Sequence, residues 1–160
     1  MRVLRVVCGL MVGLLVSTAS GPAVAQASPD PGMRAWQGAG CDACHGAFAQ
    51  GGGGGDQPAG PSLRQTNLDR SALTETIRCG RPATPMPYFM SGAYAQSPCY
   101  GMAATAPPPD VTPGGAMSAA DIDQIVEYLM ARIVGKGAIT REECGLYYAN
   151  PNHPRCAGYR

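Results

Sequence analysis

Two cysteines and a histidine stand close together in the first third of the chain, in the run Cys41-Asp42-Ala43-Cys44-His45. A Cys-x-x-Cys-His motif is the attachment signal for a c-type haem. The two thiols add to the two vinyl groups of the haem, and the adjacent histidine becomes the proximal ligand of the iron. We therefore predict that Cys41 and Cys44 form thioethers and that His45 binds the iron.

Two other kinds of site fit the same residues less well. A thioredoxin-like redox pair is expected beside a βαβ pattern, which the sequence lacks. A zinc site needs a second pair of ligands at finger-like spacing, and the only other histidine, His153, lies far along the chain. Haem attachment is therefore the favoured interpretation.

The first 27 residues have the pattern of a secretory signal peptide. Arg2 and Arg5 supply a positive start, residues 6–16 form an apolar stretch too short to span a bilayer, and small residues follow. Two overlapping Ala-x-Ala runs within 23–27 leave the cleavage site open, and an uncleaved anchor is the alternative interpretation. Because covalent haem attachment takes place on the outer side of the cytoplasmic membrane, both signals predict a bacterial periplasmic protein.

Composition is typical of one small domain with little net charge. Loss of two arginines with the signal peptide would leave 10 basic and 11 acidic residues, with no basic stripe for nucleic acid. The chain has 22 glycines and 15 prolines but few large apolar side chains. A haem that fills much of the core would account for this composition.

Three helices with long loops between them are expected, over residues 32–39, 69–79 and 118–134. Residues 81–117 carry eight prolines, so we expect no regular element of any length there. The five glycines of 51–55 predict a mobile loop. No run alternates for long enough to form a sheet, and the predicted fold class is therefore all-α.

Capping residues mark the ends of two of these helices. Ser118, with Asp121 three residues later, predicts the start of the last helix. Asn67 or Asp69 is the expected N-cap of the middle helix, and Gly80 is its expected stop.

The order of these segments resembles the class I monohaem cytochrome c family over residues 32–134. In that family a first helix runs into the haem motif and a Gly-Pro-x-Leu turn follows. A middle helix, a Met-Pro loop and a C-terminal helix complete the pattern. The matching turn and loop of this chain are Gly60-Pro61-Ser62-Leu63 and Met86-Pro87.

The resemblance implies a small cytochrome c-like fold, with three main helices around a covalently attached haem. It places the domain at residues 28–136, and a Cys-containing tail, 137–160, is expected to pack on the same domain. Trp36 and Gly32 on the first helix should meet Tyr128 on the third. The chain departs from the family in its long linker before Pro61 and in an insertion between Met86 and the last helix.

The resemblance also implies the remaining haem contacts. The carbonyl of Pro61 should accept a hydrogen bond from His45 and so orient the ring. Met86 should be the second axial ligand, because Thr84-Pro85-Met86-Pro87 matches the family's ligand loop and the prolines stiffen it. The alternatives that stay open are Met90, Met102, His153 and an open distal site. The predicted set that holds one haem c is Cys41, Cys44, His45, Pro61 and Met86, with His45 and Met86 on the iron.

Four further cysteines follow the motif, an even number that predicts two disulfides in an exported chain. Three pairings are possible. We favour Cys79–Cys99, which would bracket the Met86 loop, together with Cys144–Cys156, which would close the tail.

The function implied is that of a periplasmic electron-transfer protein rather than an enzyme, because iron with two protein ligands has no vacant position and can only change its oxidation state. A periplasmic dehydrogenase as donor and an oxidase or another cytochrome as acceptor are the expected partners. We do not expect the protein to bind nucleic acid, and we expect contact with a membrane only if the signal segment is not cleaved. Two alternatives stay open: a haem subunit permanently bound to one dehydrogenase, and a haem enzyme or small-ligand sensor with an open distal site.

The middle segment has a small excess of positive charge. Its four arginines outnumber two acidic residues and could steer an acidic partner, although a solvated helix face of mixed charge is the favoured interpretation. The residues concerned are Arg64, Arg70, Arg78 and Arg81 against Asp69 and Glu75.

Overall fold

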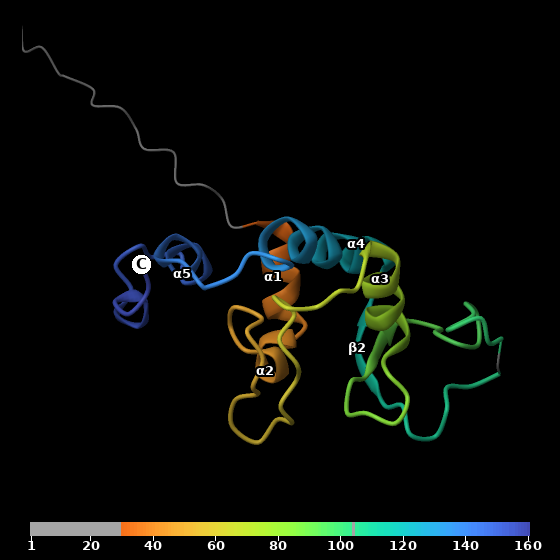
Figure 1. Ribbon diagram of the computed structural model, residues 1–160. Helices are drawn as coiled ribbons and strands as arrows, with labels where there is room; N and C mark the ends of the chain where they lie inside the picture. The colour runs from red at the N-terminus through yellow and green to blue at the C-terminus, as the bar shows by residue number, and fades with distance from the viewer. Residues whose placement is uncertain (1–29, 104) are drawn as a thin grey trace, which may run out of the picture.

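The computed structural model describes residues 30–103 and 105–160, so the predicted signal peptide lies outside the described residues. Within this part the chain forms five short α-helices, two strands, one π-helical segment and one 3-10 turn (Figure 1). The helices are α1 (Pro31–Gly38), α2 (Cys41–His45), α3 (Arg70–Cys79), α4 (Ala119–Tyr128) and α5 (Arg141–Tyr147). The strands are β1 (Tyr88–Met90) and β2 (Pro113–Met117), the π-helical segment is η1 (Leu129–Ile133) and the 3-10 turn is η2 (Pro154–Cys156).

The predicted all-α fold is wrong, because β1 and β2 pair as a two-stranded parallel sheet. Tyr88 lies opposite Pro113 and Met90 opposite Met117, with an irregularity between these pairs. Strands of three and five residues are too short to show the alternation that marks a strand in sequence. Pro113 is tolerated because it is the first residue of its strand. The architecture is a mixed small fold, not the expected bundle of three main helices.

The three predicted helices are nevertheless present. α1 and α3 begin and end within one residue of the expected bounds, and Asp69 caps α3 by accepting a 2.8 Å hydrogen bond from the N–H of Ala72. Ser118 and Asp121 form the predicted capping box. The last helix is divided, because α4 ends at Tyr128 and continues as η1.

The crossing of α1 over α4 organises the core. A Cβ atom on Gly32 would lie 2.1 Å from the carbonyl oxygen of Gln124 and 2.5 Å from Cβ of Tyr128, so only glycine allows this approach. Beside Gly32, the ring centroids of Trp36 and Tyr128 lie 6.5 Å apart, so the predicted contact between these residues is present. Leu73 and Ile77 from α3 and Phe89 from β1 join the same buried cluster.

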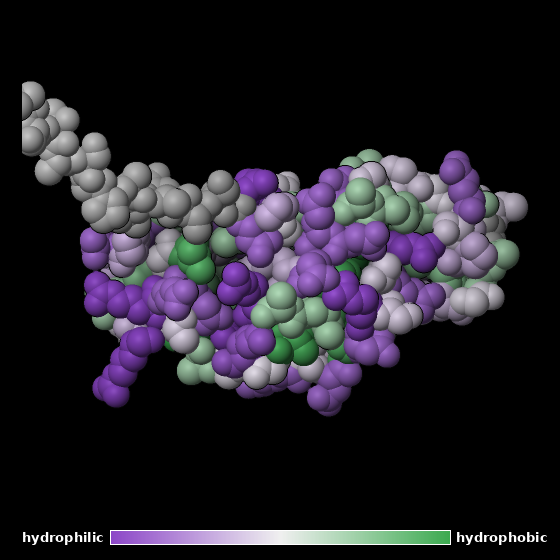
Figure 2. All heavy atoms as spheres, turned by 90° about the horizontal axis from the view of Figure 1, so that it is seen from above, coloured by the Kyte–Doolittle hydropathy of each residue, from purple (hydrophilic) through white to green (hydrophobic). Residues whose placement is uncertain are grey.

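Seen from above, the molecule shows mainly polar side chains, and apolar ones lie in separate patches (Figure 2). Among the described residues, no helix has the length and apolar character needed to cross a membrane.

Both predicted disulfides are confirmed. Cys79 is bonded to Cys99 and Cys144 to Cys156, and all four residues are fully buried. Cys41 and Cys44 are free.

We expect Ser118→Ala to lower the free energy of unfolding by about 1 kcal/mol, because the first turn of α4 loses its cap. Part of the effect acts through Asp121. Hydrogen bonds from the Ser118 hydroxyl, and then from the Ser118 N–H, lower the pKa of Asp121 below its ordinary value. The stabilisation that comes from the Asp121 carboxylate is present above the ordinary aspartate pKa and is lost as the pH falls through the lowered pKa of Asp121. Urea unfolding at neutral and at acidic pH measures the loss of the cap and its dependence on pH.

Ser71→Ala is the matched control, because Ser71 is exposed in the first turn of α3 and does not cap it. Equal losses in the two variants, or no loss in Ser118→Ala, would show that the capping box does not hold α4.

Candidate haem-binding site

A cavity of about 1340 Å³ lies between the α1–α2 part of the chain and the part that contains α3 and the strands. It is larger than the roughly 300–1,000 Å³ of common small-molecule sites. All five residues of the predicted site line it: Cys41, Cys44, His45, Pro61 and Met86. Its apolar lining includes Trp36, Leu63, Leu68, Leu73, Ile77, Phe89 and Leu129.

The helix α2 places the motif on one face. Gly40, with a φ of +69°, turns the chain in the left-handed conformation between α1 and α2. Within α2, Cys44 and His45 follow Cys41 by three and four positions, so both thiols and the imidazole lie toward the same side of the helix. All three residues line the cavity.

His45 is held in the state that a metal ligand requires. It is 8% exposed, and its Nδ1 lies 2.9 Å from the carbonyl oxygen of Pro61. Because a carbonyl can only accept, Nδ1 carries the proton, and Nε2 keeps its lone pair. Burial lowers the pKa of His45, although the Pro61 carbonyl opposes this shift, so the ring is neutral at pH 7.

The glycine-rich loop, residues 51–60, is attached to the end of α2 by backbone hydrogen bonds. Gly51 donates its N–H to the carbonyl of His45 at 2.7 Å, and Gly54 donates to Ala43 at 2.8 Å. Gly60 donates to Cys44, also at 2.8 Å. The last three carbonyls of α2, which have no partner inside the helix, are thereby satisfied.

Gly60 also sets how closely this loop approaches the imidazole. A Cβ atom at this position would lie 2.8 Å from Nδ1 of His45 and 3.0 Å from the carbonyl oxygen of Cys44. The contact between His45 and Pro61 therefore needs glycine at the preceding position.

Met86 lies across the cavity, on the loop that follows α3. It is half-buried, and its carbonyl accepts a 3.1 Å hydrogen bond from the N–H of Arg81. The Cys79–Cys99 disulfide begins at the last residue of α3 and spans this loop. Of the alternative ligands, Met102 also lines the cavity, whereas Met90 and His153 are not among its lining residues.

The lining fits a c-type haem. Cys41 and Cys44 are the free cysteines of the described chain, and both lie half-buried on the wall beside a neutral histidine. Burial, and then the charge of Asp42, raises the pKa of Cys41 to about 12, so this thiol stays protonated at neutral pH. The buried indole N–H of Trp36 has no hydrogen-bond partner in the described part of the chain. Two thiols, one imidazole and one thioether around an apolar cavity are the groups that hold a covalent haem.

The structure also shows how the predicted arginine excess is used. Arg64 is buried, with 6% of its surface exposed, and binds Glu143. Arg70 forms a 2.6 Å ion pair with Glu127, and Arg78 donates to the hydroxyl of Ser97. Two of the four arginines of this segment, Arg64 and Arg70, are therefore paired with acidic residues within the molecule.

The helix α5 and the contacts of the tail were missed by the sequence interpretation. Thr140 and Glu143 form a capping box at the start of α5, and this Thr-x-x-Glu spacing was a usable signal in the sequence. The hydroxyl of Tyr147 donates to Oδ2 of Asp42 at 2.5 Å. Burial, and then the bond to Asp42, raises the pKa of Tyr147, so the phenol stays protonated and is the donor.

Comparison with known proteins found no family model, no curated protein and no solved structure that matches this chain. The resemblance to the cytochrome c family therefore stays a prediction. Among the described residues, no three His, Cys, Asp or Glu side chains are grouped as metal ligands.

We expect Gly60→Ala to destabilise the protein by about 1–3 kcal/mol, because the new methyl group overlaps the His45 ring and must displace the loop. Gly54→Ala is the matched control in the same loop, because nothing lies within 4 Å of its Cβ position. Thermal unfolding measures the difference. A tolerated Gly60→Ala would mean that the close approach of the loop to His45 is not required.

Proposed function

We propose that this chain is a periplasmic one-electron carrier that holds one haem c. Cys41 and Cys44 would attach the haem, and His45 and Met86 would be the axial ligands. One observation carries the proposal: the two free thiols, the oriented imidazole and the Met86 thioether line a single large apolar cavity. The two disulfides and the signal-like first 27 residues support an exported, periplasmic protein.

The bound haem would supply an iron that changes reversibly between its ferric and ferrous states. Each thiol would add across one vinyl group, with its sulfur going to one carbon and its hydrogen to the other. His45 would coordinate through Nε2 while Pro61 holds the N–H of Nδ1, which fixes the ring and raises its basicity. The soft sulfur of Met86 would favour the ferrous state and raise the reduction potential.

The place of Met86 on the cavity wall favours electron transfer over catalysis. A peroxidase-like enzyme needs acid–base groups at an open distal position. Outside the Cys-x-x-Cys-His motif, the ionisable residues lining the cavity are Glu75, Arg81 and Tyr100. The hydroxyl of Tyr100 already donates to the carbonyl of Gly80. With Met86 bound to the iron, no coordination position would be left for a substrate.

The partners consistent with this role are a periplasmic dehydrogenase as donor and an oxidase or another cytochrome as acceptor. A haem subunit fixed to one dehydrogenase is a second candidate, favoured by large apolar side chains on the loop beside the cavity. Tyr100 is 38% exposed and Met102 is 48% exposed, although both also line the cavity. Co-purification with a larger subunit at stoichiometric yield would favour this second role.

We expect the mature protein, produced in a host that attaches haem c, to carry one haem on the peptide that contains residues 41–45. Its reduced spectrum should show sharp low-spin bands, and its oxidised spectrum the weak far-red band of methionine bound to ferric iron. Mass spectrometry of the peptide and visible spectroscopy measure the two properties. A protein without haem would contradict the proposal, and a high-spin spectrum that changes on adding carbon monoxide would favour a sensor or an enzyme.

Met86→Ala should abolish the far-red band and open the iron to carbon monoxide, because the distal ligand is removed. Met90→Ala and Met102→Ala are the matched controls, and both should keep the band. If one of the controls lost the band and Met86→Ala kept it, the distal ligand would be the methionine replaced in that control.

A further inference from the structure

The C-terminal tail, residues 137–160, folds against the side of the haem motif that faces away from the cavity. It contains α5 and η2, joined by the fully buried disulfide Cys144–Cys156. In Figure 1 this part lies beside α1, on the opposite side from α3. Among the tail residues that the structure describes, none lines the larger cavity.

Phe48, three residues after His45, anchors the tail. It is 6% exposed, and its ring centroid lies 5.2–6.2 Å from the centroids of three tyrosines of the tail. These are Tyr147, Tyr148 and Tyr159. The segment that leaves the haem motif is therefore packed into the core of the tail.

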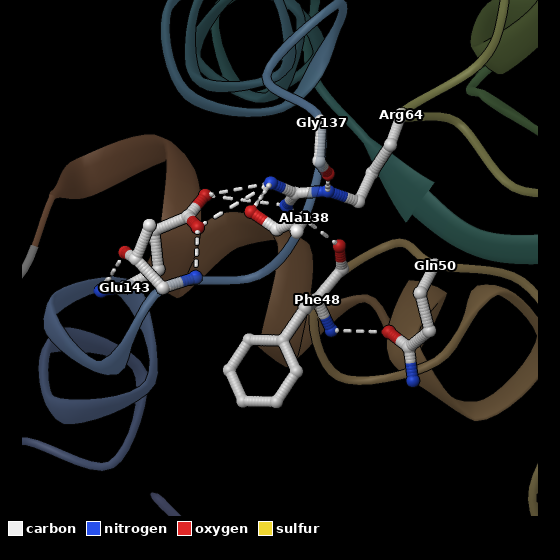
Figure 3. A network of polar contacts seen from close by, with 7 residues as sticks. Phe48, Gln50, Arg64, Gly137, Ala138 and Glu143 are labelled. Carbon is white, nitrogen blue, oxygen red and sulfur yellow. Dashed lines mark hydrogen bonds and ion pairs between the residues drawn. The ribbon is translucent and has the colours of Figure 1, made fainter. Parts of the chain in front are cut away.

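The guanidinium of Arg64 adds polar contacts to the same junction (Figure 3). It donates to both carboxylate oxygens of Glu143 at 3.1–3.3 Å and to the carbonyl of Phe48 at 3.4 Å. It also donates to the carbonyls of Gly137 and Ala138. A buried charge with this many partners joins the haem-motif segment, the Gly-Pro turn and the tail as one unit.

One contact of the tail reaches into the Cys-x-x-Cys-His motif itself. The hydroxyl of Tyr147 lies 2.5 Å from Oδ2 of Asp42, and the side-chain amide of Gln37 donates to the Tyr147 carbonyl at 3.3 Å. Asp42 stands between Cys41 and Cys44, so its carboxylate is a formal negative charge within the segment that would be bonded to the haem at both ends. Asp42 is half-buried, where charges are screened less than in water.

We propose that Tyr147 is a positioning residue that fixes the Asp42 carboxylate and partly offsets its charge, so that the tail helps to set the reduction potential of the haem. A negative charge near the iron favours the ferric over the ferrous state, because the ferric state carries one more positive charge. The O–H group of Tyr147 points its positive end at the carboxylate and weakens this effect. The inference rests on the proposed function, because it needs a haem attached at Cys41 and Cys44.

Tyr147→Phe tests this inference, because it removes the hydroxyl and keeps the ring that packs on Phe48. The midpoint potential of the haem-loaded protein should shift to a lower value, and the thermal unfolding curve checks that the variant is folded. Tyr148→Phe is the matched control, because its hydroxyl contacts Arg155 and not the motif. Its potential should equal that of the wild type. A merely structural tail would leave the potential of Tyr147→Phe unchanged.

Asp42→Asn supplies the second measurement. It should raise the potential, and adding Tyr147→Phe to it should cause no further shift, because the hydroxyl acts through the carboxylate. The inference is overturned if Tyr147→Phe leaves the potential unchanged or raises it, or if its shift persists unaltered beside Asp42→Asn. A wild-type protein without haem would refute the proposed function instead, whereas a loaded protein with an unaltered Tyr147→Phe potential would refute this inference alone.

Discussion

The site depends on a helix of a little more than one turn. α2 has five residues, so the carbonyls at its end find no partners within the helix and must be satisfied from elsewhere. Backbone N–H groups of the glycine-rich loop supply these partners, at Gly51, Gly54 and Gly60. Because the loop has to approach the backbone of α2 closely, it brings the next residue, Pro61, within hydrogen-bonding distance of His45. One constraint on the backbone thus positions the end of α2, orients the imidazole and explains why residue 60 is glycine.

Outside the site, the molecule has a small apolar core and is further stabilised by two disulfides and by the buried contacts of Arg64. The buried hydrophobic cluster is centred on the α1–α4 crossing, where Gly32 lets the backbones meet. Away from this crossing, Cys79–Cys99 closes a 20-residue separation and Cys144–Cys156 one of 12. Each is worth ~3 kcal/mol in the chain-entropy account. Arg64 links three segments through a buried charge, and its full set of partners is what makes such burial tolerable.

The two walls of the cavity are built by different means. The His45 wall is a short helix braced from behind by the glycine-rich loop and the aromatic tail. The Met86 wall is a proline-rich loop braced by a disulfide and by the β1–β2 pair. Bracing of both walls suits the proposed electron carrier, whose axial ligands would have to keep their places through each change of charge on the iron.

The sequence by itself determined which residue types are available for chemistry and where the local elements lie. The Cys-x-x-Cys-His spacing, the capped helices and the even count of cysteines depend on neighbouring residues or on simple pairing, and the structure contains these helices and both disulfides. Only the tertiary structure decided the parallel sheet, the gathering of the candidate site residues around one cavity, and the contact of Tyr147 with Asp42. Each of these joins segments far apart in the chain or depends on which way a loop turns. No local propensity encodes such choices, because they arise from packing against parts of the chain that a short window of sequence does not contain.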